Sequence, residues 1–372
     1  MNHIDRRNWL KTFALGGGLT MLGGANALAF TNPANRPSIA TLDVAKLNSN
    51  ENPFGPSPKV RKAITAAFDN ACRYPSMVFR PLLEKIAETE GVSTDHIVVT
   101  GGSTEGLKAV GLTYGLNGGE LIAADPTFQS MMTYAENFGA YVHRVPVDEN
   151  MQHDLKEMEN RVNGKTRLIF ICNPNNPTGT LLDKNDLKSF CERTSDTAMV
   201  FSDEAYYDFI TEPDYPSMVE LVKQGKNVIV SKTFSKVYGL AGMRIGYLVA
   251  RPDIAKRLQN SVMAMTNVLA IEAAKHALDD DEFYKFSVAK NMEGKQAIYK
   301  TLDDLELPYI KSHTNFVFFK TGRPIRDMMA AMEKENVLIG RPFPPFNEWA
   351  RISTGTMEDM KAFDKGLKRV MG

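Results

Sequence analysis

The sequence predicts an α/β fold with a largely parallel sheet and a smaller C-terminal lobe. Short apolar runs alternate with helical stretches through the first two thirds of the chain, which indicates a sheet covered on both faces by helices. With 372 residues, 43% of them hydrophobic, the chain is long enough for a sizeable core and two lobes. The strand-like runs are residues 97–100, 121–124, 141–145, 168–171, 199–202, 228–231 and 246–249.

Both ends of this sheet region have their own patterns. A helix capped by Ser57-Pro58 places Val60, Ile64 and Phe68 on one face, so we expect that face to pack. After residue 253 the pattern becomes helical to about residue 302. The C-terminal lobe is predicted from three later strand-like runs, residues 315–319, 337–339 and 351–353.

Residues 231–244 bring a lysine, hydroxyl groups and an arginine into one short segment. Lys236 lies just past a strand's carboxyl end, where open α/β sheets place their ligands, and its amine can form an imine with an aldehyde. Thr233 and Ser235 can donate to phosphate oxygens, and Arg244 can bind the same phosphate through two N–H groups. The alternative is a polar loop with a solvated lysine. We interpret the segment as a cradle for pyridoxal 5'-phosphate.

Two upstream motifs favour this interpretation. In Asn-Pro-Asn-Asn-Pro-Thr-Gly, residues 173–179, the prolines fix a rigid loop and Asn176 can offer its amide to a phenolate oxygen, which Tyr206 would share. Asp203 would face the cofactor's ring nitrogen, and a carboxylate there keeps that nitrogen protonated. Singly, the motifs have ordinary explanations as a turn, a helix cap or a core tyrosine. Their order after successive strands favours one site.

The motifs NPNNPTG, DEAY and SKTFSKVYGLAGMRIGY together resemble those of fold-type I aminotransferases of the class I/II superfamily. Within that superfamily the sequence most resembles the histidinol-phosphate aminotransferase branch, and the resemblance covers nearly everything after about Ala45. It implies the fold of type I pyridoxal-phosphate transferases, with a seven-stranded large domain and a smaller α+β domain. It also implies that Lys236 is the Schiff-base lysine and general acid/base, and that Arg351 binds the substrate carboxylate. The remaining implied contacts are the pyridinium for Asp203, the phenolate oxygen for Asn176 and Tyr206, and the phosphate for Thr233, Ser235 and Arg244.

Further positions match the family. Ser103 and Thr104 follow a strand and open a helical stretch, and a glycine turn at a helix N-terminus is an anion site, so we expect them to add donors to the phosphate. Phe128 falls where the family stacks a ring on the cofactor, although it could be a core phenylalanine. Tyr74 resembles the tyrosine that reaches the neighbouring subunit's cofactor phosphate, which implies a homodimer.

The sequence departs from the histidinol-phosphate pattern on the substrate side. Phe54 and Phe128 occupy positions where a tyrosine is common in that branch, so two hydroxyl contacts are missing. Arg341 lies near where the branch uses an arginine toward substrate, and it either binds a substrate anion or is an ordinary exposed arginine. We expect a substrate site with aromatic walls that suits an aromatic or imidazole-bearing donor, formed by Asn52, Phe54, Arg341 and Arg351.

The reaction that these residues predict is transamination. An amino group would pass from an amino acid or a histidinol phosphate-like amine to a 2-oxo acid by a ping-pong mechanism through Lys236, with Arg351 orienting the donor. Racemisation, elimination or decarboxylation on the same cofactor is the alternative. A non-catalytic binding or regulatory protein is a third interpretation, and the joint presence of Lys236, Asp203, Tyr206 and Arg244 counts against it.

The N-terminus resembles a twin-arginine export signal. Arg6-Arg7 precedes a modestly apolar stretch, residues 13–22, that is too short for a spanning helix, and Ala27-Leu28-Ala29 is a small-x-small cleavage site. We therefore expect a periplasmic enzyme, the alternatives being a disordered basic tail or an uncleaved anchor. That location conflicts with a routine role in histidine synthesis, so the reaction class is better supported than the branch. The expected division is a signal, 1–29, an arm and first helix, 30–70, a large domain, 71–260, and a small domain, 261–372.

Charge and cysteine usage exclude other classes. The chain has 44 basic and 44 acidic residues and no basic block after the signal, which argues against nucleic acid as a main partner. No membrane partner is expected for the mature form. Cys72, Cys172 and Cys191 lack metal-ligand spacing, and the odd count suggests buried thiols. We predict no metal site.

Overall fold

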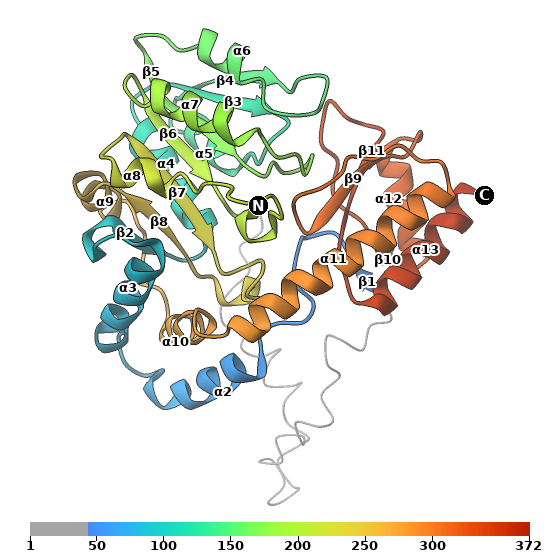
Figure 1. Cartoon of the computed structure of the whole chain (residues 1–372), viewed down its shortest axis with the longest axis horizontal. Helices are drawn as coiled ribbons and strands as arrows, with labels where there is room; N and C mark the ends of the chain where they lie inside the picture. Colours follow the sequence, from blue (N-terminus) through green and yellow to red (C-terminus); the bar gives the residue numbers. More distant parts are fainter. Residues whose placement is uncertain (1–43) are drawn as a thin grey trace, which may run out of the picture. The chain divides into compact units, whose positions relative to one another are not determined.

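A computed structural model describes residues 44–372, so the expected signal and the linker after it lie outside the described residues. The larger part is built on a seven-stranded sheet in the order β2-β8-β7-β6-β5-β3-β4 (Figure 1). β8 runs antiparallel to both of its neighbours, and the other neighbouring pairs are parallel, which confirms the predicted fold class. The strands are β2 (Ile97–Thr100), β3 (Glu120–Asp125), β4 (Tyr141–Pro146), β5 (Thr166–Cys172), β6 (Met199–Asp203), β7 (Val228–Thr233) and β8 (Gly246–Ala250).

The central strands are buried on both faces because alternate side chains enter different cores. On β5, Ile169 and Ile171 enter one apolar cluster, whereas Leu168 and Phe170 enter another. The helices that contribute to the first cluster are α2 (Pro58–Ala67), α3 (Ser76–Glu90), α6 (Leu155–Asn160), α7 (Lys184–Thr194), α8 (Val219–Lys223) and α10 (Val268–Ala277). Those of the second are α4 (Ser103–Gly115), α5 (Ser130–Glu136) and α9 (Pro252–Gln259).

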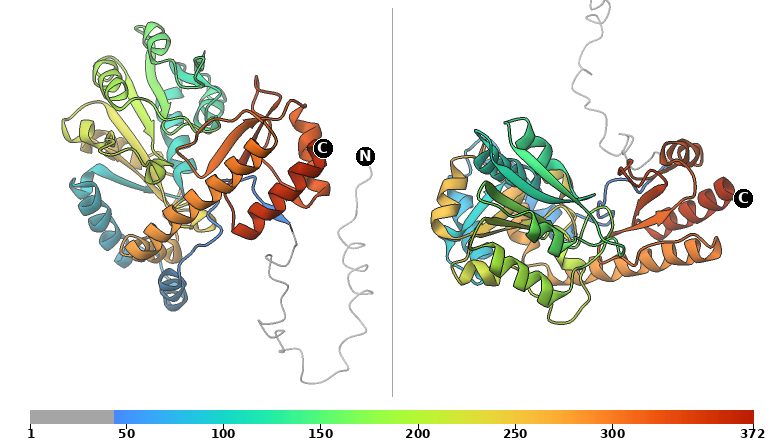
Figure 2. Two further views of the ribbon diagram at one scale, coloured as in Figure 1. Left: turned by 45° about the vertical axis from the view of Figure 1, so that its right-hand side comes forward. Right: turned by 90° about the horizontal axis from the view of Figure 1, so that it is seen from above.

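The smaller part has its own core. β9 (Phe316–Lys320) pairs antiparallel with β11 (Trp349–Ser353), and β1 (Ala45–Lys46) pairs parallel with β10 (Val337–Leu338). Their apolar side chains pack with those of α11 (Asp281–Asp304), α12 (Ile325–Lys334) and α13 (Met357–Met371), drawn in orange and red in Figure 2. The first described strand therefore joins the C-terminal core. By contrast, α10 packs against α2 and α3 although it follows residue 260, where we expect the large domain to end.

Two expectations about the N-terminal region are wrong: that Phe68 packs and that Cys72 is a buried thiol. Ser57 caps α2, with its Oγ accepting from the Val60 N–H at 3.2 Å, and Val60 is buried as predicted. Phe68, however, is 60% exposed, because α2 ends at Ala67 and a 3₁₀ turn carries Phe68 off the packing face. Cys72 lies in the following turn and is exposed, whereas Cys172 and Cys191 are buried thiols.

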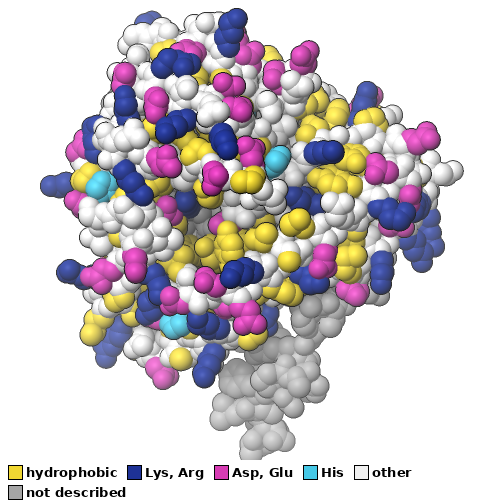
Figure 3. All heavy atoms as spheres, in the orientation of Figure 1, with side chains coloured by type: hydrophobic (Ala, Val, Ile, Leu, Met, Phe, Trp, Pro, Cys, Tyr) yellow, Lys and Arg dark blue, Asp and Glu magenta, His cyan; other side chains and the backbone are white. Residues whose placement is uncertain are grey.

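The helical stretch expected after residue 253 is divided into α9, α10 and α11. Within residues 44–372, no helix combines the length and the apolar character needed to cross a bilayer. On the face drawn in Figure 3, basic and acidic side chains are interspersed, so this face carries no extended surface of one sign.

Candidate active site

A cavity of about 620 Å³ lies where β5, β6 and β7 end. Its walls also include the start of α4, residues 48–51 and two arginines of the C-terminal part. Parallel strands bring their carboxyl ends to one edge of the sheet, so segments distant in the sequence meet there. The predicted residues that line the cavity are Ser103, Thr104, Phe128, Asn176, Asp203, Tyr206, Ser235, Lys236, Arg244, Arg341 and Arg351.

Lys236 presents its amine inside this cavity. Its Nζ donates to the carbonyl oxygen of Asn50 at 2.8 Å and lies 5.4 Å from the centre of the Tyr206 ring. Burial lowers the pKa of Lys236 to about 8, and the charge of Arg351 acts in the same direction. An appreciable fraction of the amine is therefore neutral near pH 7 and can attack an aldehyde.

Asp203 is the last residue of β6, and its buried carboxylate has few hydrogen-bond donors around it. The residue is 3% exposed, and the one hydrogen bond of its carboxylate among residues 44–372 is accepted from the Ala205 N–H at 3.2 Å. Burial raises the pKa of Asp203 to about 7 against the opposing effects of that N–H and of Lys236. A cationic N–H donor in the cavity would satisfy the free oxygen, and a protonated pyridine ring is such a donor.

Tyr206 and Asn176 lie together, as predicted for the two residues that share a phenolate oxygen. The Tyr206 hydroxyl accepts from Asn176 Nδ2 at 3.4 Å and from Asn50 Nδ2 at 2.9 Å. Burial raises the pKa of Tyr206, so its hydroxyl stays protonated and can donate.

A phosphate cradle is formed at the start of α4. Ser103 and Thr104 occupy the first turn, and Gly102 caps the helix without a side chain. A Cβ on Gly102, whose φ is 83°, would collide with the Arg244 guanidinium, so only glycine permits this approach. Backbone N–H groups, hydroxyls and a guanidinium are the donors that a phosphate requires, and the cavity therefore fits pyridoxal phosphate.

Arg351 is a buried cation that has no counter-ion among residues 44–372. Its Nη1 donates to Asn176 Oδ1 at 2.7 Å and its Nη2 to the carbonyl oxygen of Asn48 at 2.8 Å. Its Nε is buried and has no partner among the described residues, which also provide no carboxylate within ion-pair distance. Burial lowers the pKa of Arg351 to about 10, and Arg341 contributes to the shift. A ligand anion would complete this site.

The structure does not bring four of the predicted residues to the cavity wall. Thr233 Oγ1 accepts from the Ser235 N–H at 3.1 Å, so it supports the turn that holds Ser235. Asn52 Nδ2 donates to the carbonyl oxygen of Val237 at 2.8 Å and to Ser287 Oγ at 3.0 Å, which uses its amide for tertiary contacts.

The other two are Phe54 and Tyr74. Phe54 packs edge to face on Phe286, with ring centres 5.3 Å apart, and Phe54 and Asn52 line a separate small pocket. Tyr74 is 89% exposed, and its role toward a second subunit stays a prediction.

Asn50 is the main residue that the sequence interpretation missed. Its side chain donates to Tyr206, its carbonyl oxygen accepts from Lys236, and its φ of 54° is left-handed. Asparagine tolerates that conformation better than most residues, so an asparagine beside an Asn-Pro turn was the available signal. Asn48 and Cys172 also line the cavity and were not predicted.

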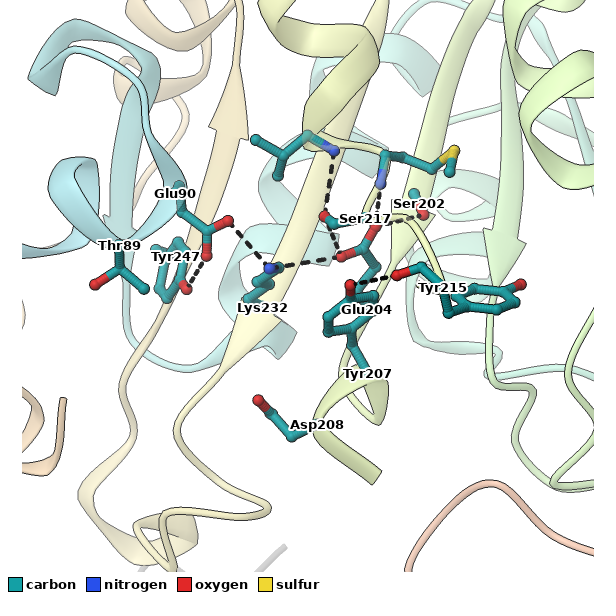
Figure 4. A network of polar contacts seen from close by, with 12 residues as sticks. Thr89, Glu90, Ser202, Glu204, Tyr207, Asp208, Tyr215, Ser217, Lys232 and Tyr247 are labelled. Atoms are coloured by element: carbon teal, nitrogen blue, oxygen red, sulfur yellow. Dashed lines mark hydrogen bonds and ion pairs between the residues drawn. The ribbon is translucent and has the colours of Figure 1, made fainter. Parts of the chain in front are cut away.

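A buried polar network supports the strand ends beside the cavity (Figure 4). Lys232 Nζ on β7 lies 3.1 Å from Glu90 Oε2 and 3.7 Å from Glu204 Oε2. Glu204 follows Asp203, and its carboxylate also accepts from Ser217 Oγ at 2.7 Å. Tyr247 on β8 donates to Glu90 at 2.6 Å. These contacts connect α3, β7, β8 and the end of β6. β6 ends at Asp203, and β7 leads into the segment that contains Lys236.

Comparisons with known proteins agree with this geometry. The family model for aminotransferase class I and II matches residues 43–366. The chain is 37% identical over 338 residues to a histidinol-phosphate aminotransferase of Moorella thermoacetica, covering 90% of this chain and 87% of the relative. It is 38% identical over 338 residues to histidinol-phosphate aminotransferase 2 of Carboxydothermus hydrogenoformans, covering 90% and 92%.

A solved structure shares both the fold and the expected cofactor. The histidinol-phosphate aminotransferase of Sinorhizobium meliloti, crystallised in complex with pyridoxal-5'-phosphate, superposes with a TM-score of 0.83 at 26% identity, over 88% of this chain and 91% of that one. With a lysine, an aspartate and a phosphate cradle in one cavity, the chain belongs to the class I and II aminotransferases and is a pyridoxal-phosphate-dependent aminotransferase.

Proposed function

We propose that the amino donor carries an anionic group that Arg351 binds with the help of Arg341, and that a 2-oxo acid is the acceptor. The observation that carries this proposal is the buried Arg351 guanidinium, whose Nε has no hydrogen-bond partner and which has no carboxylate partner in the part of the chain that the structure describes. A buried charge without a partner is unfavourable, so the site favours a ligand that supplies the missing negative charge.

Histidinol phosphate is the first donor to consider, because the relatives that match this chain carry its name. Its phosphate offers two negative charges, which suits a cavity with two arginines. An α-amino acid offers one carboxylate, which Arg351 can bind by itself. The two classes of donor therefore differ in how much they use Arg341.

Each residue has a defined task in this reaction. Arg351 fixes the donor, and Lys236 takes and returns the proton at the donor α-carbon, for which a pKa of about 8 is suited. Tyr206, Asn176 and Asp203 hold the cofactor's ring, whereas Ser103, Thr104, Ser235 and Arg244 hold its phosphate. Pyridoxal phosphate, when bound, supplies the aldehyde that accepts the amino group and the ring that withdraws electrons from the reacting carbon.

The test is a donor panel on the purified, cofactor-loaded protein. Histidinol phosphate, histidinol, phenylalanine and aspartate are each added in a single half-reaction, and the absorbance of the cofactor is followed before and after a 2-oxo acid is added. We expect amino transfer from anionic donors and its reversal by the oxo acid. Equal rates with histidinol and histidinol phosphate would show that the anionic group is not recognised.

We also propose that the enzyme acts as a homodimer. Tyr74 is 89% and Met77 is 90% exposed, and two such side chains on one segment suit a surface that a second copy covers. Light scattering of the purified protein measures the mass of the particle. A monomer at micromolar concentration would contradict this proposal, and an unchanged cofactor affinity in Tyr74→Phe would remove Tyr74 from the partner's site.

Export by the twin-arginine route is proposed from the sequence alone. Arg6-Arg7 and Ala27-Leu28-Ala29 supply the recognition and cleavage patterns. Fractionation of cells that express the full chain tests this proposal, with a variant in which Arg6 and Arg7 are both lysine as the control. Retention of the unaltered chain in the cytoplasm would contradict it.

A further inference from the structure

Phe343 contacts both arginines of the cavity. The centre of its ring lies 4.3 Å from the guanidinium carbon of Arg341 and 5.0 Å from that of Arg351. Both distances are within the range at which the face of an aromatic ring attracts a cation. Phe343 is itself 3% exposed, so the surrounding core fixes the position of its ring.

The two arginines differ in how they are held. Arg351 has two hydrogen bonds, to Asn176 and Asn48, and a second ring, that of Phe316, at 5.4 Å. For Arg341, the contacts within residues 44–372 are a hydrogen bond to the carbonyl oxygen of the adjacent Pro342 at 3.0 Å and the ring of Phe343. Phe343 is therefore the side chain that holds Arg341 at the cavity.

The ring also offsets an unfavourable interaction. Two guanidinium groups in one partly dehydrated cavity repel each other, and without an opposing attraction the exposed arginine would turn toward water. The negative face of a ring attracts both cations without neutralising either of them. Both charges thus remain free to bind an anion.

We propose that Phe343 is a specificity-determining residue, which keeps Arg341 beside Arg351 so that the cavity prefers a doubly charged anionic group on the amino donor. This inference rests on the proposed function, because it assigns the anion to the same cavity. Phe343 acts through Arg341 and is a positioning residue. A donor with a single carboxylate needs only Arg351, which two hydrogen bonds and the Phe316 ring hold in place when Phe343 is replaced.

The chain offers a matched control. Phe343 and Phe346 both pack edge to face on Phe318, with ring centres 6.1 and 6.2 Å from it, and of the two only Phe343 is within cation–π distance of a guanidinium. Phe343→Leu and Phe346→Leu therefore both remove an aromatic contact with Phe318, and only the first also removes the contact with the arginines. Phe343→Met, which fills a similar volume, replaces Phe343→Leu if that variant does not fold.

The experiment measures binding rather than turnover. The cofactor-loaded protein and each variant are titrated calorimetrically with inorganic phosphate and, separately, with acetate. We expect Phe343→Leu to weaken phosphate binding about tenfold, Phe346→Leu to change it less than about twofold, and acetate binding to be similar in all three. Arg341→Ala should weaken phosphate binding as Phe343→Leu does. The double variant should bind phosphate no more weakly than Arg341→Ala, because Phe343 affects phosphate through Arg341.

Three results would overturn the inference. They are no phosphate binding by the unaltered protein, a loss in Phe343→Leu that adds fully to that of Arg341→Ala, and equal losses for phosphate and acetate. The proposed function is judged separately from the donor panel. If histidinol phosphate is not a donor and the phosphate titrations behave as expected, the inference stands for another dianionic donor.

Discussion

Arg351 Nη1 donates to Asn176 Oδ1 at 2.7 Å, and Asn176 Nδ2 in turn faces the Tyr206 hydroxyl. The residue that we propose binds the donor's anion is thus hydrogen-bonded to one that is predicted to hold the cofactor. Asn176 lies in the loop after β5, and Arg351 lies on β11 of the C-terminal core. A donor bound to Arg351 would therefore be positioned relative to the cofactor ring through one amide side chain.

Arg351→Ala should lower kcat/KM for an anionic donor by about two to three orders of magnitude, because the proposed charged contact at a buried guanidinium would be lost. Arg351→Lys should recover only part of the activity, since an ammonium group cannot bind an anion through two parallel N–H groups as a guanidinium can. Half-reaction kinetics with the best donor measure both. Loss of less than about threefold in the alanine variant would place the anion elsewhere.

Lys236 makes cofactor loading depend on pH. Its folded pKa of about 8 lies below the ordinary 10.5, so the reactive neutral amine is a minority species below pH 8 and dominates above it. The rate at which apoprotein binds pyridoxal phosphate should rise about tenfold per pH unit below pH 8 and level off above it. N-acetyl-lysine, measured in parallel, controls for titration of the cofactor itself. A rate that continues to rise to pH 10 would contradict the shifted pKa.

Asp203 should destabilise the protein when no cofactor is bound. Its folded pKa of about 7 lies above the ordinary 3.8, so the unfavourable contribution is absent below pH 3.8, grows as the pH rises and is complete above pH 7. Asp203→Asn should therefore raise the unfolding free energy of apoprotein at pH 8, by at most roughly 4 kcal/mol, and weaken cofactor binding. Denaturant unfolding at pH 5 and pH 8 measures the difference, and equal effects at both values would count against it.

Lys232 should contribute strongly to stability because it compensates two buried carboxylates. Lys232→Met leaves Glu90 and Glu204 without their cation, and we expect a loss of about 3–5 kcal/mol in unfolding free energy. Lys226→Met is a suitable control, since Lys226 pairs with the largely exposed Asp196 and should contribute less than about 1 kcal/mol. Similar losses in the two variants would show that the network of Figure 4 does not stabilise the strand ends.

The residues that could be predicted from sequence are those fixed by local patterns. The continuous apolar run of β5 and the helix cap at Ser57 depend on short segments. A residue at a strand's carboxyl end, such as Asp203, is carried to the cavity by the sheet itself. The prediction for Phe68 was wrong because α2 ends at Ala67 and a 3₁₀ turn begins at Phe68 itself, a change of helix type that the sequence does not mark.

The contacts that could not be predicted join distant parts of the chain. Asn50 reaches Tyr206 across 156 residues, and Asn52 reaches Ser287 across 235. The Asn-Pro turn draws attention to this segment, but the distant partners decide that Asn50 faces the cavity and Asn52 faces α11. The role of Phe343 depends in the same way on where two arginines meet, which only the folded chain shows.

The most direct measurement is to reduce the cofactor-loaded protein with borohydride, digest it and locate the labelled lysine by mass spectrometry. We predict that the label is on Lys236, whose amine lies in the cavity with Asp203, Tyr206 and Arg351. Lys236→Ala should remain unlabelled while its unfolding transition stays cooperative. A label on Lys232, Lys295 or another lysine would contradict the assignment of this cavity as the aminotransferase site.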